Sequence, residues 1–330
     1  VCASTGGDNL WHRWYNLNVR RNCRHIFVQE DRRIKTWAHQ RRCPRGLLRI
    51  NGDNCFDNFL LGITNLMRLG TTSYIYPADI ITNVRKLAGQ TQDIELVFFE
   101  IDDRWDSLPT DSEINELKEI ASKFDMTYTV HLPLNVYLSD HHPCIEKTIK
   151  VIEATLPLNP FAYICHLESS ELAASTHISI WERQSINSLE ILIDVIGDPS
   201  KLCVENLETQ APSLLDHITD NLPVSYCIDI GHFWKKGLDP MPYMQRWFPR
   251  ARVIHMHGFE GSDHKSLSVV NFAKLDPIVE IINKHFRGVV TLEVFSEKDF
   301  LESVESFWNS LERIMRSEER RVGKECRSRW

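Results

Sequence analysis

The feature that most constrains the fold is a repeated unit in which a β-rich run is followed by a helical run. Eight such units follow one another, at the roughly 30-residue spacing that is typical of parallel β/α architecture. The β-rich runs cover residues 68–76, 94–100, 127–132, 161–167, 201–208, 224–229, 252–258 and 288–295. This repeat predicts an α/β domain, a single closed (β/α)8 TIM barrel. An open doubly wound sheet is the alternative, but no Gly-x-Gly-x-x-Gly motif follows the first run.

The segments between the strands have helical periodicity. Residues 112–124 carry apolar side chains at helical spacing, and Thr110 or Ser112 could cap this helix. A helix can begin at Pro77, after the first run, and further helices are expected at 145–156, 178–196, 212–221, 276–285 and 297–315. In such a barrel the carboxyl ends of the strands meet at one face, where we expect the active site.

The two ends of the chain lack this pattern. Residues 1–66 hold 11 Lys and Arg against 5 Asp and Glu, and residues 317–330 are equally without period. We expect 67–316 to be the catalytic domain, 1–66 to be a non-native or disordered extension, and 317–330 to be a non-native tail that resembles translated vector sequence. A zinc site is the alternative for the first segment, although its candidate ligands fit no paired CxxC spacing: Cys23, His25, Cys43 and Cys55.

The predicted barrel is strongly acidic. Residues 67–316 contain 37 Asp and Glu against 22 Lys and Arg, a formal net charge of −15. Because phosphate contacts need clustered cations, this balance argues against a nucleic acid as partner. No apolar run reaches the roughly 18 residues of a membrane helix. The cysteines of this region are scattered rather than paired. We therefore expect a cytoplasmic protein with reduced cysteines and no membrane partner.

Nearly every predicted strand ends in an acidic residue or a histidine. The set comprises Glu100, His131, His166, Glu205, Asp229, His232, His255, Asp263, His264 and Glu293. A lone strand histidine is more often a hydrogen-bonded core residue, but so many polar groups are costly to bury unless they are paired. These residues are expected to converge on the rim of the barrel, which the carboxyl ends of the strands form, and this convergence favours a metal site. Imidazole with carboxylate, and no thiolate, suits Zn²⁺, Mn²⁺ or Fe²⁺.

This pattern resembles the xylose-isomerase-like barrels of the endonuclease IV type, over the whole of 67–316. The resemblance implies a metal-binding tetrad on strands five to eight, formed by Glu205, Asp229, His255 and Glu293. The phosphodiesterase branch adds two histidines, here His131 and His166, which imply a second metal ion bridged by Glu205. A third ion would be held by His232 with an Asp-x-His pair. This chain departs from that pattern, because the acid and histidine are adjacent here, as Asp263 and His264.

Within this group the chain is most similar to the CbiR-type cobamide-remodelling phosphodiesterases. The similarity rests on residues 68–79, 128–134, 203–208, 229–232 and 255–258, with 263–264. It implies a corrinoid substrate and hydrolysis of the nucleotide-loop phosphodiester of a cobamide, such as cobalamin. The products would be cobinamide phosphate and the lower-ligand riboside. The expected cofactors are two zinc ions, or three, with manganese or iron as alternatives.

Roles for individual residues follow from this resemblance and from their places on the rim. Catalytic roles are expected for Glu205, Asp229 and Glu293. We further expect Tyr74, Glu100 and His257 to border the substrate. For Glu100 the alternatives are orienting a metal-ligating histidine or forming a structural salt bridge. His257 could instead form a hydrogen bond behind the ligands.

Three other functions compete with the phosphodiesterase. A sugar isomerase or epimerase would need one metal and only the tetrad, with two glutamates moving a proton. A DNA-repair nuclease is disfavoured by the acidic charge. A corrinoid-binding protein without enzymatic activity would leave the rim of metal-type ligands unexplained. The sequence does not specify an oligomeric state.

Overall fold

The computed structural model describes residues 67–99, 108–134, 136–138, 145–168 and 178–327, with side chains up to Ser317. In this part of the chain, eight parallel strands close into a barrel in the order β1-β10-β7-β6-β5-β4-β3-β2. The strands are β1 Arg68–Thr72, β2 Asp93–Val97, β3 Thr127–His131, β4 Ala162–Cys165, β5 Leu202–Glu205, β6 Ser225–Asp229, β7 Ala251–Met256 and β10 Val289–Leu292. The predicted (β/α)8 barrel is confirmed.

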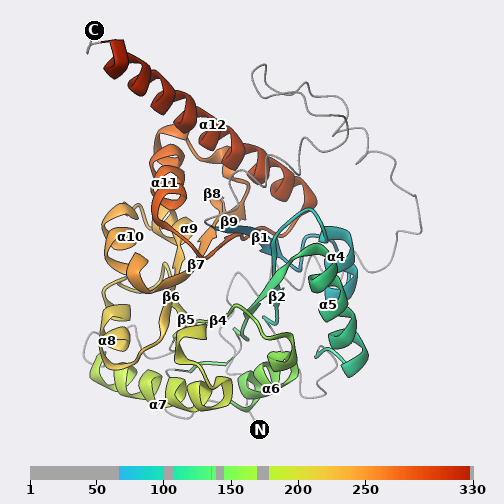
Figure 1. The fold of residues 1–330 in the computed structure, drawn as a ribbon. Helices are drawn as coiled ribbons and strands as arrows, with labels where there is room; N and C mark the ends of the chain where they lie inside the picture. Colours follow the sequence, from blue (N-terminus) through green and yellow to red (C-terminus); the bar gives the residue numbers. More distant parts are fainter. Residues whose placement is uncertain (1–66, 100–107, 135, 139–144, 169–177, 328–330) are drawn as a thin grey trace. The chain divides into compact units, whose positions relative to one another are not determined.

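The helices form a ring around the strands (Figure 1). They are α4 Ile80–Leu87, α5 Asp111–Phe124, α6 Glu146–Thr155, α7 Ile178–Ile196, α8 Leu214–Asn221, α9 Ile230–Lys235, α10 Met241–Trp247, α11 Phe272–His285 and α12 Glu297–Arg327. Helix α5 buries one apolar face, formed by Ile114 and Leu117. Thr110 caps α5, and Glu113 completes a reciprocal capping box with it. Among the described residues, no helix is long and apolar enough to cross a bilayer.

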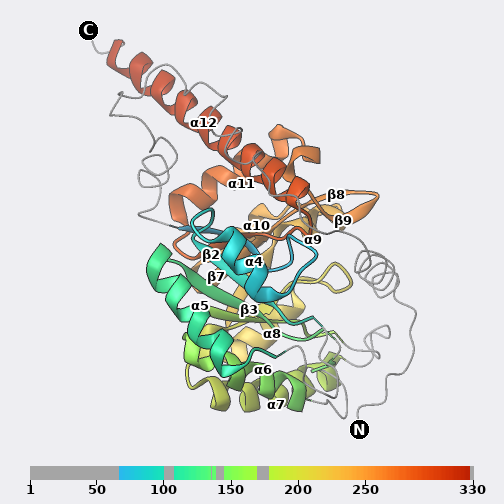
Figure 2. The ribbon, with the colours of Figure 1, turned by 90° about the vertical axis from the view of Figure 1, so that its right-hand side faces the viewer.

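Several elements differ from the sequence-based expectation. The short helices α9 and α10 were not predicted, nor was the hairpin of β8 Gly258–Glu260 and β9 Ser262–Lys265, which lies beside α9 (Figure 2). Most strands end earlier than predicted, because the β-rich residues that follow them leave the sheet and enter the rim loops. Helix α12 runs past the predicted end at Met315 to Arg327. The non-native origin of 1–66 and 317–330 stays a prediction.

The barrel interior combines an apolar layer with buried polar groups. Small side chains from four neighbouring strands pack together, namely Ala162, Ile164, Cys203, Cys227 and Val253. On the opposite strands, the carboxylate of Asp93 is buried and accepts hydrogen bonds from the hydroxyls of Thr127 (2.6 Å) and Thr129 (2.8 Å). Gly70 allows β1 and β2 to approach here, because a Cβ at residue 70 would lie 2.8 Å from the Asp93 carbonyl oxygen.

Asp93 makes the stability of the barrel depend on pH. Burial raises the pKa of its carboxyl group from 3.8 to about 7, although the two threonine hydroxyls lower it. Between these two pH values the folded protein holds a proton that the unfolded chain releases. The contribution of Asp93 to stability is therefore lost as pH rises through this window.

We predict that Asp93→Asn is more stable than the parent at pH 8, by on the order of 2 kcal/mol, and that the gain shrinks toward pH 5. Urea unfolding at both pH values measures the difference. The exposed Asp194 in α7 provides the control, since Asp194→Asn should change stability little at either pH. An equal effect of Asp93→Asn at pH 5 and pH 8 would contradict this role.

Candidate metal centre

The carboxyl ends of the strands bring the predicted rim residues together. His131, Glu205 and Asp229 are the last residues of β3, β5 and β6, and His255 is the fifth residue of β7. The others lie just beyond their strands: His166 after β4, His232 in α9, His257 after β7, Asp263 and His264 in β9, and Glu293 after β10. All of these side chains are buried or nearly so. The fold thus gathers on one face groups that are far apart in the sequence.

The first cluster contains the predicted tetrad. Glu205, Asp229, His255 and Glu293 each offer one ligand atom, and these atoms all lie within 4.8 Å of one another. His255 Nδ1 lies 3.3 Å from Glu205 Oε1 and 3.2 Å from Glu293 Oε2. The cluster therefore has three carboxylates and one imidazole around a common point.

Glu95 of β2 orients the histidine of this cluster. Its Oε2 lies 2.8 Å from His255 Nε2, and both side chains are fully buried. This contact keeps a proton on Nε2, so that Nδ1 is the nitrogen that faces the Glu205 and Glu293 oxygens and that would bind a metal ion after losing its own proton. A carboxylate behind the outer nitrogen is the usual support of a metal-ligating histidine.

The second cluster shares Glu205 with the first. Glu205 Oε2 lies 3.1 Å from His166 Nε2 and 3.5 Å from His131 Nε2. The other nitrogen of His131, Nδ1, lies 3.0 Å from the Leu132 carbonyl oxygen, which fixes Nε2 as the nitrogen that faces the cluster. Glu205 thus presents Oε1 to His255 and Oε2 to the two histidines. This is the geometry of a bridging carboxylate.

These donor atoms fit a divalent metal ion. Glu293 Oε2 is buried without a hydrogen bond, although it faces His255 Nδ1, which is the contact expected when both atoms are ligands of a common ion. Oxygen and imidazole donors suit Zn²⁺, Mn²⁺ and Fe²⁺. Cys227 also lies within reach of Glu205 and His255, which adds one soft donor that the sequence did not indicate.

The charges of the two clusters are strongly coupled. Burial raises the pKa of Glu205, but His255 and His166 outweigh it and hold that pKa well below its usual value. Burial lowers the pKa of His255, whereas the surrounding carboxylates raise it well above its usual value. Burial raises the pKa of Glu293. Since a metal must displace the imidazole protons, we expect metal affinity to fall as pH decreases.

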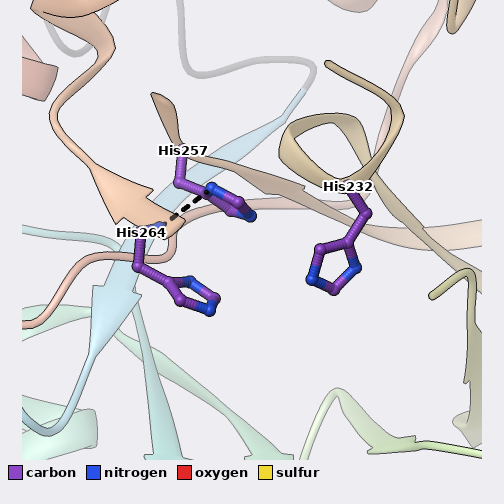
Figure 3. Close-up of side chains that lie close together, drawn as sticks. All are labelled: His232, His257 and His264. Atoms are coloured by element: carbon purple, nitrogen blue, oxygen red, sulfur yellow. Dashed lines mark hydrogen bonds between the residues drawn. The ribbon is translucent and has the colours of Figure 1, made fainter. Parts of the chain in front are cut away.

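A third group of side chains lies beside the tetrad. His232, His257 and His264 face a common space, with ring centroids 4.4 Å apart for His257 and His264 and 5.5 Å for His232 and His257 (Figure 3). Burial and the neighbouring His257 and His232 hold the pKa of His264 well below its usual value. Gly231 is required here, since a Cβ at this residue would lie 2.1 Å from His257 Cε1. These rings are held close together by the backbone of α9 and the hairpin.

Asp263 and His264 reach the rim in different ways. Asp263 forms an ion pair with Lys235 of α9, and its Oδ1 lies 3.4 Å from His257 Nδ1. His264 has a left-handed backbone, with φ 52°, and its Nδ1 lies 3.2 Å from the Glu293 carbonyl oxygen. His232 Nε2 lies 3.5 Å from Glu208 Oε2, the other partner of Lys235. A third candidate cluster is therefore Glu208, His232 and Asp263, and the ring nitrogens of His232, His257 and His264 also lie close enough together to hold an ion.

The predicted substrate-bordering residues have different positions. Tyr74 is half-buried and contacts Phe295 edge to face, and Phe295 also packs on Phe99 and His264. His257 is fully buried between Asp229 (3.3 Å) and Asp263, which places it behind the rim. Glu100 lies outside the described residues. One alternative role for Glu100 was to orient a metal-ligating histidine. For His255, Glu95 has this role.

Several residues of the site were not identified from the sequence. Glu95 alternates with Ile94 and Leu96 inside a strand, and such an inward-facing acid is the signal that could have identified it. Asn206 holds Asp229 by accepting from its N–H and donating to its carbonyl oxygen, each at 2.9 Å. Its own carbonyl oxygen contacts His232 Nδ1 at 2.9 Å. Glu208 also belongs to this set, although it lies within the motif at residues 203–208. Lys235, Phe99 and Phe295 complete the set and lie outside the motifs found in the sequence.

We predict that Glu205→Gln lowers metal affinity at both clusters by at least about 100-fold, because it removes the charge of the shared carboxylate while keeping its size. Equilibrium dialysis against Zn²⁺ followed by metal analysis measures the bound ions per chain. Glu190→Gln, at an exposed position of α7, should match the parent. Unchanged metal content in Glu205→Gln would exclude Glu205 as a ligand.

Glu95→Gln tests the support behind His255. An amide cannot hold the Nε2 proton as strongly as a carboxylate, so we expect affinity for one of the two ions to fall by about 10- to 100-fold. A Zn²⁺ titration that resolves two classes of site would show one class weakened. If both classes were weakened equally, or neither, Glu95 would not act through His255.

Comparison with known proteins shows the fold of the chain. No protein-family model matches it, and a search of curated proteins finds no match. Among solved structures, a D-tagatose 3-epimerase-like protein has a TM-score of 0.63 at 18% identity and covers 76% of this chain and 99% of its own. Endonuclease IV from Thermus thermophilus has a TM-score of 0.56 at 15% identity and covers 74% and 99%.

Further similar structures are mostly sugar epimerases. D-psicose 3-epimerase in the presence of D-fructose has a TM-score of 0.54 at 15% identity and covers 69% of this chain and 85% of its own. At such identities the likeness extends to the arrangement of the strands and helices. The part of the chain that the structure describes forms a single eight-stranded parallel β/α barrel with the xylose-isomerase-like fold.

Proposed function

We propose that this protein is a metal-dependent phosphodiesterase. The observation that carries the proposal is the shared carboxylate of Glu205, which faces the tetrad with one oxygen and His131 and His166 with the other. An enzyme that needs one metal requires only the tetrad. The additional buried histidines are explained if a second ion binds beside the first, as in hydrolases that use two metals.

The residues of the rim can take different roles in phosphodiester hydrolysis: binding the metal ions, accepting a proton and neutralising phosphoryl charge. The bound ions would supply Lewis acidity toward the phosphoryl oxygens and lower the pKa of a water molecule. Of the residues with an expected catalytic role, Glu293 is a better acceptor of the water proton than Asp229, since its Oε2 has no hydrogen bond. Asp229 already accepts the His232 N–H at 2.7 Å and contacts His257. His232 faces the same space as His264, and, against the effect of burial, the neighbouring carboxylates raise its pKa, so that it would neutralise phosphoryl charge. The lowered pKa of His264 leaves that ring uncharged, so it would act as a hydrogen-bond donor or as a ligand.

The proposed substrate is a cobamide, cleaved in its nucleotide loop. The motifs at 68–79, 229–232 and 255–258 support this choice. So does the line of aromatic side chains that runs from Tyr74 through Phe295 to Phe99, which meets His131 at a centroid distance of 4.9 Å. Tyr74 and Phe295 are partly exposed, and aromatic rings beside a metal site suit the aromatic base of a lower ligand. Cobinamide phosphate and the lower-ligand riboside would be the products.

A sugar isomerase or epimerase is the second candidate, and the structural comparisons favour it. The similar structures include a D-tagatose 3-epimerase-like protein and D-psicose 3-epimerase. In this alternative one ion would hold a hydroxy-ketone, and Glu205 and Glu293 would move a proton between two faces of a carbon. His131 and His166 would then be dispensable for metal binding.

One pair of assays separates the two candidates. We expect the metal-loaded protein to convert adenosylcobalamin into cobinamide phosphate and the riboside, detected by liquid chromatography and mass spectrometry. His131→Ala should lower the rate by at least about 100-fold, because it removes a predicted ligand of the second ion. Glu190→Gln is the matched control. Intact cofactor, together with exchange of a ketohexose C–H proton in D₂O that His131→Ala leaves unchanged, would establish the epimerase instead.

A further inference from the structure

Lys235 forms an unusual contact at the rim. Its ammonium group pairs directly with Glu208, from the loop after β5, and with Asp263, from the hairpin strand β9. Lys235 itself lies three residues after His232 on α9, so that the two side chains share one face of the helix. One cation therefore ties together three segments at the edge of the metal centre.

The partners of this lysine have the composition of a cation site. Glu208, His232 and Asp263 each offer a ligand atom, and these atoms lie within 4.8 Å of one another. The Asp263 side chain is 8% exposed, and its Oδ1 is buried without a hydrogen bond. His232 Nδ1 contacts the Asn206 carbonyl oxygen, so Nε2 is the nitrogen that faces Glu208, at 3.5 Å. Two carboxylates and an imidazole nitrogen are a sufficient donor set for a divalent ion.

We propose that Lys235 is a built-in cation that fills this third cluster and excludes a further divalent ion from the rim. A carboxylate pair that is neutralised by an ammonium group offers much less attraction to an incoming ion than the same pair alone. The two clusters that share Glu205 remain open to metal ions, and the positive charge of the third cluster is a side chain.

The environment of Lys235 keeps it charged. Burial lowers the pKa of its amine, but the contacts with Asp263 and Glu208 outweigh burial and raise it. The side chain is 28% exposed, so its ammonium group remains close to solvent at the open edge of the site. A bound divalent ion would need to displace it, with loss of both ion pairs.

The test counts metal ions in matched variants of the whole chain. Parent, Lys235→Met, Lys235→Arg and Lys236→Met proteins are dialysed against Zn²⁺ and, separately, Co²⁺, and the bound ions per chain are measured by mass spectrometry. Lys236 is the control, because its amine donates to the Gln210 carbonyl oxygen. We expect Lys235→Met to bind one more ion than the parent. Lys235→Arg and Lys236→Met should bind the same number as the parent.

A double variant keeps the result specific. Lys235→Met with Asp263→Asn should return to the ion count of the parent, because the extra ion would lose a carboxylate ligand. Circular dichroism establishes whether each variant is folded. If a folded Lys235→Met binds no additional ion, or if Lys235→Arg also gains one, the inference is overturned.

The change in ion count on replacing Lys235 tests this inference separately from the proposed phosphodiesterase activity. A parent that binds one ion and a Lys235→Met variant that binds two would support the inference while contradicting the two-metal phosphodiesterase. A parent that binds two ions and a variant that also binds two would leave the proposed function intact and overturn this inference.

Discussion

The loss of hydration at one rim of the barrel is the constraint on which the rest of the site depends. Glu205, Asp229 and His255 are almost completely buried. A charged group in such surroundings is stable only if opposite charge and hydrogen bonds replace the lost water. Here every buried carboxylate of the tetrad faces an imidazole, and His255 is held between Glu95 and two further acids. The polar interior is thus one coupled system rather than a set of independent residues.

Periodicity was enough to predict the barrel, since eight strand-like runs separated by amphipathic helices have few other solutions. It also placed His131, Glu205 and Asp229 at the rim, because all three end a strand. Glu95 could not be found by examining strand ends, as it lies in the middle of β2 with its side chain inside the barrel. The hairpin of β8 and β9 is too short to produce a periodic signal.

Contacts between loops could not be predicted from any local pattern in the sequence. Lys235, Glu208 and Asp263 come from three segments whose closeness depends on the closed barrel. The same is true of the aromatic line through Phe295, whose neighbours lie after β1 and β2 and in the hairpin. The fold, in turn, does not identify the reaction, because one barrel supports many chemistries through its rim loops. The discriminating information lies in which side chains accompany the tetrad.

Asp229 has two structural roles, and together they couple the metal centre to the start of helix α9. It ends β6 and at the same time caps α9, with Oδ1 accepting the N–H of His232 while Oδ2 faces His257. No loop separates the strand from the helix that carries His232 and Lys235. A shift of this carboxylate would therefore loosen the first turn of α9 and move both side chains together. The rate of amide hydrogen exchange in α9 should consequently report whether the centre is filled, without any substrate.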